Sequence, residues 1–254
     1  MAFRKFLSAL GVDAPSVETV IENPKVSPGG TLRCVVTAVG GGADVDIERV
    51  RLEVVVRAED LEQGNGTAWK DPYAVVTADL DGFRLPAGET VTVRGELVLP
   101  WEMPLTHALG APIAGGRAAV RTELVVDKAA DQGDFDEFEV HALPAQDAVL
   151  RAYTDLGFRM REAEVKIGFL PEQAPDMESR QTEDFWQEID FFFPESWDQG
   201  RGELETLFVA REDSLDAHPG GFPPVTFVYD ELDQQVWMEA LEEHVRGHWL
   251  RADG

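Results

Sequence analysis

Two histidines near the C-terminal end are the first side chains in this sequence that could hold a metal ion. His244 and His248 are four residues apart within 230–251, a segment whose apolar residues recur at helical spacing. Residues four apart lie on one face of a helix, and paired imidazoles are common zinc ligands. Val245 occupies the position at which a zinc protease of the HExxH type carries its catalytic glutamate. The pair therefore indicates either a Zn²⁺ site or two histidines on the polar face of a helix.

A second group of potential ligands is the acidic segment 127–137, with the sequence DKAADQGDFDE, between two predicted strands. Calcium requires several oxygen ligands, and a carboxylate-rich loop of a β-sandwich can supply them. The spacing matches no defined calcium loop, and Lys128 places a positive charge inside the segment. A solvated acidic loop is the simpler interpretation, and Ca²⁺ binding is the alternative.

Short motifs for common catalytic chemistries are missing from the sequence. It contains no GxSxG nucleophile motif, no GxGxxG dinucleotide motif and no GxxxxGK[ST] phosphate loop. The glycines at 40–42 precede a predicted strand and not a helix N-terminus, so they are not expected to bind phosphate. We predict that the protein is not an enzyme, and we assign no catalytic, cofactor-binding or metal-binding residue and no cofactor.

The charge balance excludes one class of partner. With 48 acidic and 22 basic residues, the chain has a formal charge of −26. Nucleic-acid binding depends on neutralising phosphates with Lys and Arg, so no nucleic-acid partner is expected. An anionic membrane surface would repel the chain for the same reason. The charge either keeps the protein soluble or forms an acidic face that binds a basic partner protein.

The N-terminal residues bear on the location of the protein. An apolar stripe of helical spacing marks residues 2–10 as a short helix, formed by Phe3, Phe6, Leu7 and Leu10. We expect this helix to pack on the first domain, with insertion into a membrane interface as the alternative. The segment lacks the apolar core and cleavage site of a secretory signal. The sequence also contains no run of about 18 apolar residues, the length that a helix needs to span a bilayer. We predict a cytoplasmic protein.

Cys34 is the single cysteine of the chain, and it lies on the apolar face of a predicted strand. A cysteine in such a position is usually a small buried hydrophobic residue, so we predict no catalytic role for it. One cysteine cannot form a disulfide within the chain, which fits a reducing compartment.

The clearest strand pattern lies in residues 31–57, where two alternating runs flank the glycines at 40–42. Alternation indicates strands with one face on a core and the other in water. Because glycine-rich turns favour chain reversal, we predict an antiparallel hairpin. Its buried residues are predicted to be Leu32, Cys34, Val36 and Ala38 in the first run and Val50, Leu52, Val54 and Val56 in the second. Its outward face carries a basic row, a candidate partner surface, formed by Arg49, Arg51 and Arg57.

Strand patterns continue on both sides of one helical segment, residues 144–156, which Gly157 ends. Before this segment, further short strands are predicted over 17–22, 73–81, 90–99, 117–126 and 135–141. After it, strands are predicted over 158–169, 180–193, 203–210 and 225–229, with a turn-rich loop at 216–221. We therefore predict an all-β protein with an N-terminal sandwich over 1–143, a connecting segment over 144–157, and a C-terminal sandwich with a terminal helix over 158–254.

A set of segments taken in order resembles the bacterial sporulation-control proteins of the stage-zero type M family. These segments are the N-terminal FxxFL helix, VETVIE, SPGGTLRCVVTAVGGGADVDIERVRLEVVVR, TVTVRGELVLPWEMPLT and LGFRMREAEV. The likeness covers most of the chain and is strongest over residues 1–60 and 90–165. After about residue 175 it is loose.

This resemblance implies an arrestin-like architecture of two tandem β-sandwich domains with short N-terminal, connecting and C-terminal helices. It also implies a cytoplasmic, non-enzymatic regulator or adaptor that controls sporulation or development through contacts with other proteins. An exposed edge strand could capture an extended peptide or form a homodimer. The competing hypothesis is a Ca²⁺- or Zn²⁺-dependent binding protein or enzyme that uses the acidic loop 127–137 or the His244/His248 pair.

Overall fold

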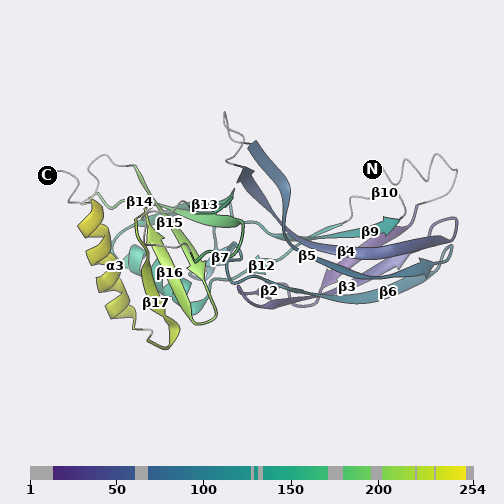
Figure 1. The fold of residues 1–254 in the computed structure, drawn as a ribbon, viewed down its shortest axis with the longest axis horizontal. Coiled ribbons are helices and arrows are strands. Elements are labelled where there is room, and N and C mark those ends of the chain that lie inside the picture. The colour runs from purple at the N-terminus through teal and green to yellow at the C-terminus, as the bar shows by residue number, and fades with distance from the viewer. Residues whose placement is uncertain are drawn as a thin grey trace.

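The computed structural model is elongated and consists mostly of β-strands (Figure 1). Its described residues are 14–60, 68–126, 129–130, 134–170, 180–195, 202–220, 222–231 and 233–249. The helix predicted over 2–10 lies outside these ranges. Within them, no helix is both long and apolar enough to cross a bilayer.

Strand β4 (Val45–Asp60) hydrogen-bonds to strands from both ends of the molecule. Along one edge it pairs with β5 (Ala68–Leu85). Along the other edge it pairs first with β9 (Ala119–Val126) and then, at residues 58–60, in parallel with β13 (Arg159–Ile167). The result is one ten-stranded sheet, which also contains β10 (Ala129–Ala130), β11 (Phe135–Glu137), β14 (Phe185–Phe192), β15 (Glu203–Ala210), β16 (Ser214–Pro219) and β17 (Val225–Val228).

A three-stranded sheet packs against the β5-β4-β9 part of this sheet and completes an N-terminal sandwich. It consists of β1 (Ser16–Ile21), β3 (Thr31–Val39) and β6 (Thr90–Val98), all antiparallel. The hydroxyl oxygens of Thr19 and Thr122 form a buried hydrogen bond of 2.6 Å between the two sheets. All eight residues predicted to be buried in β3 and β4 are in the core.

The predicted hairpin over 31–57 is wrong, because β3 and β4 belong to different sheets and do not pair. The chain crosses from one sheet to the other at residues 40–44, so both apolar faces meet the same core from opposite sides. Alternation reports which face of a strand is buried, but it does not report the partner strand.

The crossing requires glycine at position 40 because the backbone of another segment lies too close for a side chain, and not because of a positive φ angle. Its N–H donates to the carbonyl of Glu89 at 2.8 Å. A Cβ atom on Gly40 would lie 2.0 Å from the carbonyl oxygen of Pro86. The loop therefore packs directly on the backbone of the β5–β6 turn.

In the C-terminal half, the described strands form one sheet whose inner face is covered by helices. Strands β13 to β17 pair consecutively and antiparallel. Tyr153 of α2 (Pro144–Asp155) contacts Phe191 of β14 with ring centroids 4.9 Å apart, and Trp237 of α3 (Gln234–Trp249) contacts Phe227 of β17 at 4.4 Å. The second sandwich expected over 158–254 is thus a sheet-and-helix unit in the described residues, because two amphipathic helices supply the apolar layer.

The turn-rich loop predicted at 216–221 is mostly strand β16, which is a second correction. Its polar sequence, SLDAHP, is typical of a loop. Asp216 is nevertheless buried. Ion pairs with Arg180 at 2.7 Å and Arg211 at 2.9 Å compensate the cost of burying its charge. Buried charges with partners are compatible with a strand inside a sheet.

The helices predicted over 144–156 and within 230–251 are both present, as α2 and α3. The side chain of Gln146 accepts a hydrogen bond from the N–H of Leu143 at the start of α2, and Gly157 ends that helix with a φ of +93°. Asp233 caps α3 by accepting from the N–H of Gln235 at 3.0 Å. The buried stripe of α3 is Trp237, Leu241 and Val245. Val236 lies outside this stripe and is 56% exposed.

Short elements complete the description. They are β2 (Lys25–Val26), which pairs in parallel with β12 (Glu139–Val140), the hairpin of β7 (His107–Ala108) and β8 (Ala111–Pro112), and the 3₁₀ turn Tyr229–Glu231. The β2–β12 and β7–β8 ribbons lie between the two ends of the molecule, close to the start of α2 (Figure 1).

The basic row predicted on β4 is largely neutralised by its neighbour β5. Arg51 donates from Nε and Nη2 to the two carboxylate oxygens of Asp79, at 2.8 and 3.0 Å, and Nε of Arg49 lies 3.4 Å from the same carboxylate. The guanidinium of Arg57 lies over the ring of Trp69 at 4.0 Å. These contacts make the row a weaker candidate for a partner surface than the sequence suggested.

The burial of Cys34 predicts low thiol reactivity. Cys34 is 1% exposed, and burial, with a smaller effect from Asp136 and Glu22, raises its pKa to about 11. We expect the native protein to react with a thiol reagent at pH 8 far more slowly than the urea-unfolded chain, because only the thiolate is nucleophilic. Equal labelling rates for the two states would contradict the position of this residue in the core.

Substitution of Gly40 tests the close contact at the sheet crossing. We expect Gly40→Ala to lower the free energy of unfolding by about 1–3 kcal/mol, because its Cβ must displace backbone. The control is Gly247→Ala in α3, where a Cβ meets nothing within 4 Å and the helix should gain up to about 1 kcal/mol. Urea unfolding measures both. A neutral Gly40→Ala variant would show that the contact is not needed.

Candidate functional site

The acidic loop predicted over 127–137 is described only in part, and Lys128 lies outside the described residues. Glu137 forms an ion pair with Arg117. Asp134 accepts a hydrogen bond of 3.0 Å from the N–H of the following residue. These two carboxylates are therefore engaged with separate partners, and calcium binding by this loop stays the untested alternative to a solvated acidic loop.

The His244/His248 pair is held by packing. The two rings lie with centroids 4.2 Å apart, and the Nδ1 atom of His248 is 2.8 Å from the carbonyl oxygen of His244. The ring of Phe222 contacts that of His248 at 4.7 Å. Burial, followed by the proximity of His248, lowers the pKa of His244. In the described part of the chain, no third metal-ligating side chain joins the pair.

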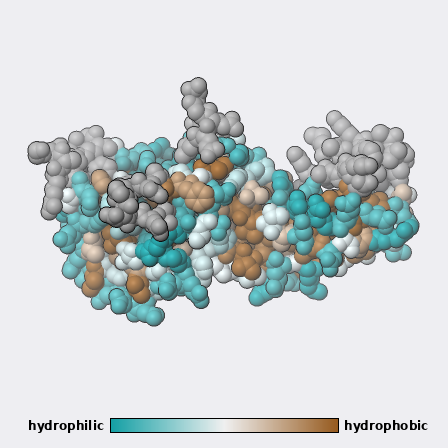
Figure 2. Space-filling view, in the orientation of Figure 1, coloured by the Kyte–Doolittle hydropathy of each residue, from teal (hydrophilic) through white to brown (hydrophobic). Residues whose placement is uncertain are grey.

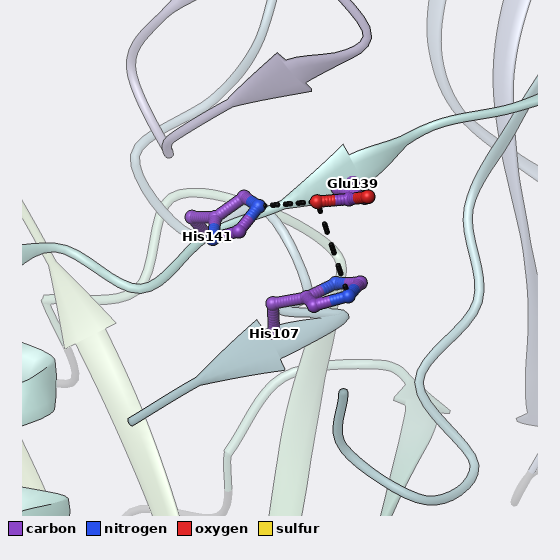
Figure 3. Close-up of side chains that lie close together, drawn as sticks. All are labelled: His107, Glu139 and His141. Carbon is purple, nitrogen blue, oxygen red and sulfur yellow. Dashed lines mark hydrogen bonds and ion pairs between the residues drawn. The ribbon is translucent and has the colours of Figure 1, made fainter. Parts of the chain in front are cut away.

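A different set of side chains, His107, Glu139 and His141, forms a compact cluster at the centre of the molecule (Figure 3). One potential ligand atom from each of them lies within 4.8 Å of the others. The two imidazole rings are stacked with centroids 4.8 Å apart and an angle of 22° between their planes. We refer to these three residues as the histidine–glutamate cluster.

Backbone hydrogen bonds position the cluster. The N–H of Glu139 donates to the carbonyl of Pro24 at 2.7 Å, and the N–H of His141 donates to that of Val26 at 2.8 Å, which fixes β12 against β2. The carbonyl of His107 accepts from the backbone N–H that follows His141, at 2.9 Å. Since both strands are anchored through their backbones, the three side chains project from a defined frame.

The carboxylate of Glu139 is the centre of the cluster. Its Oε2 atom lies 2.6 Å from Nε2 of His141, 3.0 Å from Nζ of Lys25 and 3.9 Å from Nε2 of His107. The hydrogen bond from His141, and then that from Lys25, lower the pKa of Glu139. The carboxylate is therefore ionised at neutral pH.

The orientation of His107 is set from its other ring nitrogen. Nδ1 of His107 lies 2.9 Å from the hydroxyl of Thr106, and that hydroxyl accepts the N–H of Val140 at 2.8 Å. If Nδ1 donates to the hydroxyl, the Nε2 atom that faces Glu139 carries a lone pair. This tautomer leaves Nε2 of His107 able to bind a cation.

Sequence reasoning missed the histidine–glutamate cluster. Glu139 and His141 are two residues apart in a predicted strand, so they share a face, and this pattern was available from the sequence. His107 is remote in sequence, and nothing local places it beside them. The backbone bridge that places His107 beside His141 is visible only in the tertiary structure.

A cavity of about 310 Å³ adjoins the cluster, and His107 and Glu139 are among the residues that line it. Arg117 and Glu137, which are paired with each other, line it as well. The cavity gives the cluster access to water or a small polar ligand.

The outer surface of the C-terminal sheet carries a second feature, which we call the acidic sheet face. It is formed by carboxylates of β13, β14 and β15, namely Glu164, Glu188, Asp190, Glu203 and Glu205. Figure 2 shows one side of the molecule, which is largely hydrophilic, with hydrophobic residues gathered near its middle.

At one end of this face, Lys166 offsets part of the negative charge. Its ammonium group binds Glu59 of β4, lies 2.7 Å from Glu164 and is 3.5 Å from Glu188. Burial acts to lower the pKa of Lys166, but the hydrogen bonds to Glu164 and Glu59 outweigh it, so the pKa is raised. This network joins β4, β13 and β14 at the seam between the two ends of the molecule.

Farther along the face, like charges stand directly opposite one another. Asp190 is the register partner of Glu205. Burial, and then Glu205 and the neighbouring carboxylates, raise the pKa of Asp190 to about 6. Like charges in directly opposed positions destabilise an antiparallel sheet. The folded protein therefore carries electrostatic repulsion at this site.

This repulsion predicts a pH dependence of stability. The folded state holds the proton of Asp190 more tightly than the unfolded state does, so stability should rise as pH falls from about 7 through 6 toward 4. Asp190→Asn should be more stable than the parent at pH 7.5, and the difference should vanish near pH 4. Thermal unfolding across this range measures the effect. Asp46→Asn, at an exposed site in the other half, is the matched control, and an equal gain in that variant would contradict the local origin.

Three comparisons identify relatives of the chain. The profile of the Spo0M family, described as "SpoOM protein", matches residues 3–218. Sporulation-control protein spo0M of Bacillus subtilis (strain 168) is 30% identical over 218 residues, which are 84% of this chain and 78% of that protein. The crystal structure of Spo0M from Bacillus subtilis superposes with a TM-score of 0.74 at 26% identity, over 92% of this chain and 98% of that one. The chain belongs to the Spo0M family of sporulation-control proteins.

Proposed function

We propose that this protein is a non-enzymatic, cytoplasmic regulator that controls sporulation or a related developmental process as an adaptor for other proteins. Family membership over residues 3–218 supports the regulatory role. The name of the Bacillus subtilis relative, a sporulation-control protein, is the basis for the process that we propose.

The observation that carries the binding part of this proposal is the repulsion on the acidic sheet face. Asp190 and Glu205 oppose each other in the sheet, while the nearby cations Arg161 and Lys166 form their ion pairs with other carboxylates. A basic surface docked on this face would supply the missing counter-charges and remove the repulsion. The partner that fits is thus a protein with a cluster of Lys and Arg side chains.

Two modules would act in this adaptor. We propose an arrestin-like N-terminal sandwich over 1–143 and a C-terminal unit over 158–254, joined by the segment 144–157. In this arrangement the acidic sheet face belongs to the C-terminal unit. The N-terminal sandwich contributes strand edges, such as that of β5, whose described pairing is with β4 alone. Edge strands of this kind can bind an extended segment of a second protein.

Crosslinking in the source bacterium, with a charge-neutralised variant, tests the proposal. The double variant Asp190→Asn and Glu205→Gln should lose partners that the parent protein captures, because the docking charges are gone. The control is Glu48→Gln with Glu89→Gln, which makes the same change in net charge at exposed sites in the other half. Binding of the identified partner should weaken as salt rises, since exposed charge interactions are screened.

Two outcomes would contradict this proposal. One is that no protein is enriched over an unrelated acidic bait. The other is that the face variant and the control variant keep identical partners and identical sporulation frequency. Light scattering on the purified protein separates a homodimer from a complex with a different protein.

A further inference from the structure

The histidine–glutamate cluster plays no part in the proposed adaptor function, and its chemistry points elsewhere. Imidazole nitrogens and carboxylate oxygens are ligands of Zn²⁺, and two histidines with one carboxylate form a recurrent set at zinc sites that keep one open position. We propose that His107, Glu139 and His141 form a binding site for a divalent transition-metal ion, with Zn²⁺ as the best match.

Interatomic distances in the cluster suit such an ion. Zinc lies about 2.0–2.1 Å from nitrogen and oxygen ligands, so two ligands of a tetrahedral ion are separated by roughly 3.3 Å. Oε2 of Glu139 is 2.6 Å from Nε2 of His141 and 3.9 Å from Nε2 of His107. These values lie on either side of the required separation. The ligand atoms of all three residues lie within 4.8 Å of one another. Because the two imidazole rings are stacked, at least one ring must turn about its side-chain torsions before both can direct a lone pair at the same ion.

The second nitrogen of His107 has the support that metal-binding histidines usually have. A ligating histidine commonly donates its other ring N–H to a fixed acceptor, which sets the tautomer and the ring orientation. Nδ1 of His107 lies 2.9 Å from the hydroxyl of Thr106, and that hydroxyl is itself held by the N–H of Val140. In the tautomer in which Nδ1 donates to this hydroxyl, Nε2 carries the lone pair and can bind an ion that Glu139 also holds.

Lys25 is the competitor that the ion must displace. Its Nζ atom lies 3.0 Å from Oε2 of Glu139, and its side chain is 69% exposed. An exposed ion pair of this kind contributes little to stability, so a bound divalent ion can release the ammonium into solvent. The two cations compete for the same carboxylate.

The location of the site gives the ion a structural consequence. His107 belongs to β7, and Glu139 belongs to β12, whose chain continues directly into α2. Asp147 of α2 accepts a hydrogen bond of 2.7 Å from the N–H of Leu109, just after β7. An ion would therefore add a bond between segments that already meet at the junction of the two halves. The adjoining cavity of about 310 Å³ leaves room for water as a fourth ligand.

Cobalt and zinc titrations of the purified, chelator-treated full-length protein test this site. One equivalent of Co²⁺ should produce the intense visible absorption of a low-coordinate cobalt ion, and one equivalent of Zn²⁺ should abolish it. His107→Gln, His141→Gln and Glu139→Gln should each weaken Zn²⁺ binding at least tenfold. His248→Gln, which alters the other histidine pair, should leave binding unchanged.

Lys25→Met provides a variant in which every proposed ligand is kept. It should bind Zn²⁺ as tightly as the parent or more tightly, because the competing ammonium is gone. Zinc should also raise the melting temperature of the parent and of Lys25→Met, but not that of the three ligand variants. Stoichiometry well below one ion, binding that survives all three ligand substitutions, or binding lost in His248→Gln would each overturn the proposal.

Discussion

The pairing of β4 along both of its edges is the constraint on which the rest of the structure depends. β9 occupies one edge up to Val55, and β13 continues along that same edge from Ala58. The strand is buried on both faces near this transition, where Val54, Val55 and Val56 are all in the interior. A strand covered on both faces needs a continuous apolar run. The two ends of the molecule are therefore joined by a shared sheet, strengthened by the ion pair between Lys166 and Glu59.

Negative charge is distributed unevenly over this framework. In the N-terminal sandwich, acidic and basic residues alternate across neighbouring strands, as in the pairs Arg51–Asp79 and Arg121–Glu53. On the C-terminal sheet Asp190 opposes another carboxylate, and burial together with its acidic neighbours raises the pKa of Asp190 to about 6. On the acidic sheet face Asp190 stands opposite Glu205, and this opposition is the basis on which we propose that a basic protein docks there.

Local periodicity accounts for what sequence reasoning predicted correctly. The buried residues of β3 and β4, the burial of Cys34 and the position of α2 follow from spacing along a single element, because side chains alternate in strands and repeat every 3.6 residues in helices. The resemblance to the sporulation-control family was also available from the order of its segments, and the comparisons confirm it. The wrong predictions concern partners, as with the hairpin over 31–57, or polar strands such as β16 whose charges find partners only after folding.

The amino-acid sequence was enough to establish a mostly β, strongly acidic chain of this family, since composition and alternation are properties of neighbouring residues. Tertiary structure decided which strands share a sheet, which layer covers the C-terminal strands and which ionisable groups meet. The histidine–glutamate cluster illustrates the reason. Glu139 and His141 share a strand face by sequence alone, but His107 reaches them only because β7 is held beside β12. Contacts between residues distant in the chain depend on the whole fold, and no local pattern encodes them.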